Sequence, residues 1–233
     1  NTTLSDDQPI VLEWNNGEGI IFKRKINLDD KYLFKISQQV QNNTGKTIEL
    51  YPYAQITRNK VPDDIQNFYI SHEGFIGVFD EELKEDDYDD IKEKKIVREA
   101  NEGWLGITDK YWMTAVVPSK GKNFKSTFLY KDGYKANYIL NTPTIINPSS
   151  QNENDVRLFV AAKEVDTIDA YAENQNISKF DLVIDWGWFY FFTKPLFFII
   201  DYLFKLTGNF GIAIVLIFYV TFYNLVLGVQ NST

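Results

Sequence analysis

Short runs in which apolar and polar residues alternate fill the chain between residues 9 and 58. Clusters of Gly, Asn and Asp separate these runs. A period of two is typical of strands that bury one face, and runs recurring roughly every 8–12 residues between turn signals are typical of a β-sandwich or barrel. The pattern predicts strands over residues 9–14, 20–26, 32–40 and 47–58.

Strand-like runs return in the middle of the chain. Lys-Asp-Gly at residues 131–133 predicts a hairpin turn, and the polar stretch 147–155 predicts a loop. Apolar residues at helical spacing predict a helix over residues 164–173. Further strands are expected over residues 74–79, 103–118, 123–130, 134–140 and 156–162. Residues 1–180 are therefore expected to form one mainly β domain.

Residues 80–95 are dense in Asp, Glu and Lys. A calcium loop needs acidic residues at fixed offsets around a Gly, and this run does not have that spacing. Interleaved Lys residues favour a solvated, mobile loop, with cation binding as the alternative.

The last fifth of the chain has a different pattern. No charged side chain follows Lys205, and residues 206–228 are mostly Ile, Val, Leu, Phe and Tyr. About 20 apolar helical residues are enough to cross the ~30 Å hydrocarbon core of a bilayer. The pattern predicts a transmembrane helix within residues 208–233. The alternative is an aromatic helix packed on the sheet of a soluble protein.

Residues 181–207 lie between the β domain and the predicted span. Aromatic rings with a polar edge favour the lipid headgroup level, and lysine side chains extend from lipid toward water. Asp201 lies four residues before Lys205, on one face of a predicted amphipathic helix in the membrane interface. The candidate membrane-interface residues are Trp186, Trp188, Tyr190, Lys194 and Lys205.

Composition narrows the functional classes. The 233 residues carry a net charge of −8, which argues against nucleic acid as a partner and against electrostatic docking on anionic lipid. The chain has no Cys, so thiolate catalysis, disulfides and Cys-ligated metals are excluded.

Candidate chemistry is sparse. His72, the single histidine, lies beside Glu73 and could act as a general base. A surface or turn histidine without a catalytic role is the favoured interpretation. Trp104, Tyr111 and Trp112 suit a sugar-stacking platform, although core aromatics in strands are the favoured interpretation. We expect no catalytic, cofactor-binding or metal-binding residue, no cofactor and no enzymatic activity.

Two segments resemble a known family. Residues 103–112, GWLGITDKYW, are similar to a strand motif of the periplasmic domain of bacterial YidC membrane-protein insertases. Residues 180–190, FDLVIDWGWFY, and 193–196, TKPL, resemble the linker into the membrane part of that family. The resemblance covers about residues 8–217.

The resemblance implies a β-supersandwich periplasmic domain, followed by an amphipathic interfacial helix and one transmembrane helix, the first of the insertase core. It implies location at the bacterial inner membrane with the β domain in the periplasm. It also implies insertion and folding of inner-membrane proteins, with or without the Sec translocon. The implied partners are inner-membrane lipid, nascent membrane proteins and the Sec translocon.

The chain departs from the family near its C-terminus. In the family a basic residue on the first core helix marks a hydrophilic groove that receives substrate. At the corresponding place this chain has Phe222 or one of its neighbours, and no Arg or Lys follows Lys205. A charge inside a bilayer is costly and is usually kept for function, so its absence argues against insertion by this chain alone. The likeness fades from about Phe218, and an N-terminal part is expected to be missing.

The leading hypothesis is therefore a YidC-type insertase segment that does not insert proteins on its own. The alternatives are a membrane-anchored carbohydrate-binding sandwich domain and an anchored domain that has lost its activity. An enzymatic form of the first alternative needs His72 and a carboxylate close to Trp104 or Trp112.

Overall fold

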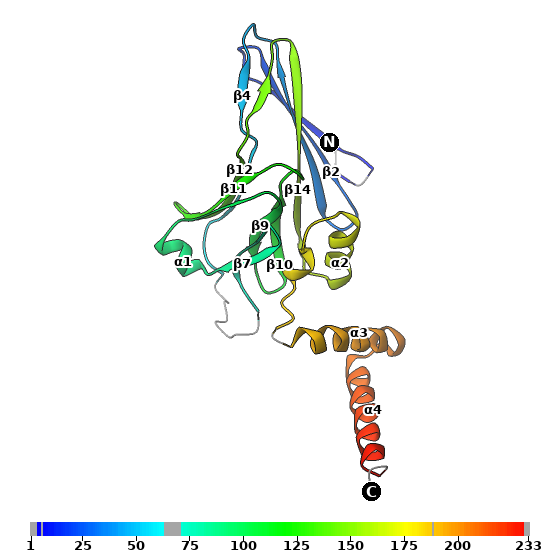
Figure 1. Ribbon diagram of the computed structural model, residues 1–233. Coiled ribbons are helices and arrows are strands. Elements are labelled where there is room, and N and C mark those ends of the chain that lie inside the picture. The colour runs from blue at the N-terminus through cyan, green and yellow to red at the C-terminus, as the bar shows by residue number, and fades with distance from the viewer. Residues whose placement is uncertain (1–3, 6, 63–70, 188, 231–233) are drawn as a thin grey trace. The chain divides into compact units, whose positions relative to one another are not determined.

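The computed structural model describes residues 4–5, 7–62, 71–187 and 189–230, with the backbone alone at residue 190 and over residues 224–230 (Figure 1). Contacts divide the chain into two compact units, Asn1–Ile184 (unit 1) and Asp185–Thr233 (unit 2).

An eight-stranded antiparallel sheet forms the larger part of unit 1, with the strand order β1-β2-β3-β14-β10-β9-β6-β7. Its strands are β1 (Ile10–Asn15), β2 (Ile20–Leu28), β3 (Leu33–Asn42), β14 (Ser150–Ala162), β10 (Trp112–Val117), β9 (Gly103–Thr108), β6 (Gly74–Phe79) and β7 (Glu82–Asp86).

A four-stranded antiparallel sheet, in the order β5-β12-β11-β8, packs against part of it. Its strands are β5 (Tyr53–Arg58), β12 (Tyr134–Leu140), β11 (Phe124–Tyr130) and β8 (Ile96–Ala100). A small third sheet pairs β13 (Thr144–Ile146) with β4 (Ile48–Leu50). The predicted mainly β, sandwich-like fold is confirmed.

Two apolar clusters stabilise unit 1. The first contains Phe75, Phe124 and Phe128 and fills the space between the two larger sheets. The second lies on the other face of the eight-stranded sheet, beneath α2 (Val165–Asn174) and the short 3₁₀ helix η1 (Phe180–Val183). There Trp104 packs edge-on against Phe180, with the ring centroids 5.4 Å apart.

The prediction of a mobile loop at residues 80–95 was wrong. The run forms β7, the helix α1 (Tyr88–Glu93) and the approach to β8. Tyr88 and Ile91 are buried in the first cluster, and Asp86 forms a bidentate ion pair with Arg98. Burial of these three side chains orders a segment whose other residues, apart from the partly buried Leu83, are exposed.

Three other boundaries differ from the predictions. Residues 47–58 form two strands, β4 and β5, which break at Tyr51-Pro52. Residues 103–118 form the β9–β10 hairpin rather than one strand, and β9 begins at Gly103, where an added Cβ would lie 1.9 Å from the Val78 carbonyl oxygen. Most of the predicted polar loop 147–155 belongs to β14, because Ser150–Asp155 pair with the equally polar end of β3.

Unit 2 consists of the helices α3 (Tyr190–Thr207) and α4 (Phe210–Gln230). Gly208 ends α3 in the left-handed conformation and donates its N–H to the carbonyl of Phe204. Asn209 precedes α4, and its Oδ1 accepts the N–H of Ile212 at 3.2 Å. Within the residues whose side chains are described, no helix is long and apolar enough to cross a membrane. Residues 231–233 of the predicted span lie outside the described residues.

Candidate membrane-interface segment and groove

The linker and the start of α3 bring two predicted interface residues together. The ring of Trp186 packs edge-on against Phe197 at a centroid distance of 5.4 Å. The Nζ of Lys194 lies 5.8 Å from the Trp186 ring centroid, in cation–π range. Thr193 donates its hydroxyl to the Trp186 carbonyl at 2.8 Å, which fixes the linker on the first turns of α3.

The remaining predicted interface residues fall elsewhere. Lys205, at the end of α3, pairs with Asp201 at 2.7 Å. Tyr190 begins α3, but its side chain is not described, and Trp188 lies outside the described residues.

Most large apolar side chains along α3 are exposed within unit 2. They include Phe191, Phe192, Phe197, Phe198, Ile199, Tyr202 and Leu206. A helix with so much apolar surface, an ion pair between Asp201 and Lys205 and lysines near both ends has the composition of an interfacial helix.

The aromatic residues of the 103–112 motif divide between the core and the surface. Trp104 is fully buried, as expected for a core aromatic, and donates its Nε1–H to the Ser178 carbonyl at 3.0 Å. Tyr111 and Trp112 are exposed, so their prediction as core residues was wrong. They lie at and just after the turn between β9 and β10, where the first cluster ends.

His72 is held by its neighbours. Its Nε2 lies 2.9 Å from the carbonyl oxygen of Phe75, and its Nδ1 lies 3.7 Å from Asp87. No group of three or more potential His, Cys, Asp or Glu ligands occurs in the part of the chain that the structure describes.

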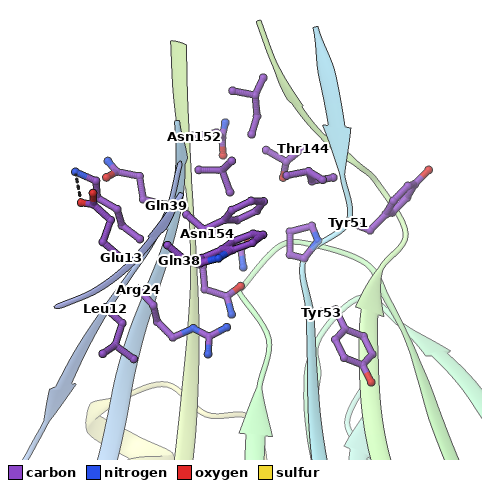
Figure 2. A pocket seen from close by; sticks show the side chains of 17 residues that line it. Leu12, Glu13, Arg24, Gln38, Gln39, Tyr51, Tyr53, Thr144, Asn152 and Asn154 are labelled. Carbon is purple, nitrogen blue, oxygen red and sulfur yellow. Dashed lines mark ion pairs between the residues drawn. The ribbon is translucent and has the colours of Figure 1, made fainter. Parts of the chain in front are cut away.

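A groove of about 530 Å³ opens between the far ends of the sheets in unit 1 (Figure 2). Its floor is formed by β1, β2, β3 and β14. In Figure 2, Tyr51 and Tyr53 stand on one side, and Leu12, Arg24 and Gln38 on the other. The facing wall contains Leu50, Tyr51, Pro52, Tyr53, Thr144 and Ile146. Partial burial raises the pKa of the Tyr53 hydroxyl.

Strand register arranges the floor in rows. Trp14 pairs with Phe22, Phe22 with Val40 and Val40 with Asn152, which makes a largely apolar row across four strands. The rings of Trp14 and Phe22 lie 5.4 Å apart.

The adjacent row is more polar. It runs from Leu12 through Arg24 and Gln38 to Asn154. Asn154 is 6% exposed; its Oδ1 accepts bonds from Ser119 and Lys122, but its Nδ2 has no partner. An unpaired buried donor costs about 1–3 kcal/mol, so an acceptor placed in the groove would be stabilised there.

The local residue pattern carries little signal of this groove. Leu12, Trp14, Phe22 and Val40 follow the alternating pattern of their strands, but this pattern predicts only an ordinary buried face of a sheet. The opposing wall comes from residues 50–53 and 144–146, and only the folded topology shows that the two faces stay apart.

Comparison with known proteins decides the family. The family model of the YidC periplasmic domain matches residues 1–199. The chain belongs to this family. Its YidC relatives include the membrane protein insertase YidC of Pelagibacter ubique (strain HTCC1062), 50% identical over 92% of this chain and 38% of the relative. The insertase YidC of Brucella suis biovar 1 (strain 1330) is 38% identical over 93% of this chain and 37% of the relative.

The chain thus spans about two-fifths of the length of these YidC relatives. The resemblance inferred from the two YidC motifs is confirmed, and the carbohydrate-binding alternative is not favoured. Among solved structures, a galactose mutarotase related enzyme from Lactobacillus acidophilus aligns with 67% of this chain and 70% of its own, at 12% identity and a TM-score of 0.46. So low a score carries no argument about function.

Proposed function

We propose that this chain is the periplasmic domain, interfacial helix and first core span of a YidC-type insertase in the bacterial inner membrane. The observation that carries the proposal is the family match over residues 1–199, which takes in all of unit 1 and the start of α3. The activity is assistance to the insertion and folding of inner-membrane proteins, without covalent chemistry. The proposed partners are membrane lipid, nascent membrane proteins and the Sec translocon.

In this proposal α3 lies in the membrane interface. The exposed side chains of Phe192, Ile199 and Leu206, spaced seven residues apart along one face of α3, enter the headgroup region, while the ion pair between Asp201 and Lys205 on another face meets water. Trp186 and Lys194 hold the linker at the same level, because an indole ring and a lysine ammonium both favour the boundary between lipid and water.

The membrane span is assigned to the apolar residues that follow α3. Residues 208–230, which include the 21 residues of α4, contain no charged side chain, and about 20 apolar helical residues match the hydrocarbon thickness of a bilayer. No Lys or Arg follows Lys205, so this span offers no basic residue to a polar segment of substrate. The chain is therefore expected to need the remaining insertase helices for activity.

Rescue of cells depleted of their own insertase tests this proposal. A chimera in which this chain replaces the aligned part of the Pelagibacter ubique relative is expected to restore growth, whereas the 233-residue chain alone is not. The unaltered relative is the positive control. Rescue by the chain alone, or failure of a chimera that accumulates normally in the membrane, would contradict the assignment.

A further inference from the structure

Four large apolar side chains are exposed at one end of the eight-stranded sheet. They are Tyr32, Tyr111, Trp112 and Val160, and Trp112 is 62% exposed. We call this set the aromatic rim. It lies outside the groove and outside the linker described above.

Backbone contacts hold the rim together around the last residues of β14. The N–H of Val160 donates to the carbonyl of Tyr32 at 3.4 Å, on the β3 side. On the β10 side, Trp112 pairs with Ala162, and the N–H of Lys163 donates to the carbonyl of Tyr111 at 2.8 Å. The four side chains therefore come from three neighbouring segments that meet at one end of the sheet.

The turns that carry the rim are fixed by polar contacts. Asp109 closes the β9–β10 turn by donating its N–H to the Trp112 carbonyl at 2.8 Å, and its carboxylate pairs with Arg58 at 2.5 Å. Asp29 holds the turn before β3, because its Oδ1 accepts the Leu33 N–H and the Tyr171 hydroxyl. These contacts fix the backbone of the turns beside the rim, so its aromatic side chains remain exposed to solvent.

Lysines border the aromatic rings. The Nζ of Lys110 lies 5.3 Å from the ring centroid of Tyr111, and Lys163 donates to Thr108 at the base of the same turn. Tryptophan and tyrosine rings bordered by lysine are typical of surfaces at the lipid headgroup level. The net charge of −8 on the chain disfavours docking on anionic lipid, so zwitterionic lipid is the expected surface.

The rim lies at the end of unit 1 from which the chain departs. β14 passes through Lys163 directly into α2, and Tyr171 of α2 touches the Asp29 turn. Figure 1 shows α2 and the last residues of unit 1 at this same end of the sheet. The linker with Trp186 follows immediately in sequence.

We propose that the aromatic rim is a second membrane contact, which places Trp112 and the two tyrosines among the headgroups of zwitterionic lipid. This inference rests on the proposed membrane attachment of unit 2. A few rings bind lipid weakly by themselves, but attachment through the same chain raises their effective concentration at the surface.

The test uses the absence of cysteine. The full chain, with one cysteine introduced by Lys110→Cys and labelled with a polarity-sensitive fluorophore, is reconstituted into phosphatidylcholine vesicles containing a nitroxide lipid. The probe is expected to shift to shorter wavelength and to lose at least half of its emission. Lys46→Cys, exposed at the opposite end of the sheet beyond Asn42, is the matched control and is expected to keep its emission.

Two further variants separate the possible failures. Adding Trp112→Ser to Lys110→Cys is expected to remove most of the quenching while circular dichroism stays unchanged, because Trp112 is exposed. Phe191→Cys reports on α3 itself. Quenching at residue 191 but not at residue 110, or quenching at 110 that survives Trp112→Ser, overturns the rim assignment alone. Absence of quenching at residue 191 overturns the proposed membrane attachment of α3.

Discussion

Replacing Trp104 with alanine is expected to lower the free energy of unfolding of unit 1 by about 3–5 kcal/mol. Trp104 is fully buried, packs edge-on against Phe180 and donates its indole N–H to the Ser178 carbonyl. The variant leaves a large cavity beneath η1 and removes the hydrogen bond that joins the sheet to the segment after α2. Urea denaturation of the full chain in detergent micelles, followed by near-UV circular dichroism, measures the change.

Trp112→Ala is the matched control for this variant. The two tryptophans lie in the same hairpin, but Trp112 is exposed, and exposed substitutions usually change stability by no more than about 0.5 kcal/mol. Equal losses for the two variants would show that burial beneath η1 does not stabilise unit 1.

Replacing Arg98 with alanine is expected to cost about 3–5 kcal/mol, because it leaves the carboxylate of Asp86 buried without its partner. The guanidinium of Arg98 binds both oxygens of Asp86, at 2.6 and 2.8 Å. It also lies over the rings of Phe79 and Phe128, at 5.5 and 5.7 Å from their centroids. The pair therefore joins β7 to β8 across the first apolar cluster, and thermal unfolding of the full chain measures its loss.

Lys84→Ala is the control, since Lys84 and Glu82 form an exposed ion pair at 2.8 Å on the same strand. Exposed pairs contribute about 0–1 kcal/mol. The double variant Arg98→Met with Asp86→Leu removes both charges and is expected to recover much of the stability lost in Arg98→Ala. Equal effects of Arg98→Ala and Lys84→Ala would argue against a structural role for the buried pair.

The sandwich was predictable from local pattern where strands alternate, as β11 and β12 do at the centre of the four-stranded sheet. In β12 every second residue from Tyr134 to Leu140 is buried, and the intervening ones are partly exposed. The Lys-Asp-Gly turn before it also marks the hairpin with β11. Here local propensity and tertiary packing favour the same structure.

Elements that are stabilised by residues far away in the sequence were not predictable. The acidic run is ordered by Arg98, which lies on another strand, and its charged composition favours a loop when considered alone. The polar half of β14 pairs with Gln38–Asn42 of β3, more than a hundred positions earlier in the sequence. Period and charge carry no information about such pairings.

The candidate site was partly predictable. Sequence reasoning named Trp186 and Lys194 as interface residues because an aromatic cluster beside an apolar run is a local signal, and the structure brings their side chains together. It did not separate the buried Trp104 from the exposed Trp112, since both stand in apolar strand patterns within one motif. Only the position of the β9–β10 turn distinguishes them.

Membrane topology tests the central claim most directly. Because the chain has no cysteine, single variants Lys46→Cys in unit 1 and Ser232→Cys after α4 are unambiguous targets for a membrane-impermeant maleimide. In cells with a permeabilised outer membrane, the account predicts labelling at residue 46 at once and at residue 232 only after the inner membrane is disrupted. Labelling of both positions before disruption would contradict the proposed span and the periplasmic location of unit 1.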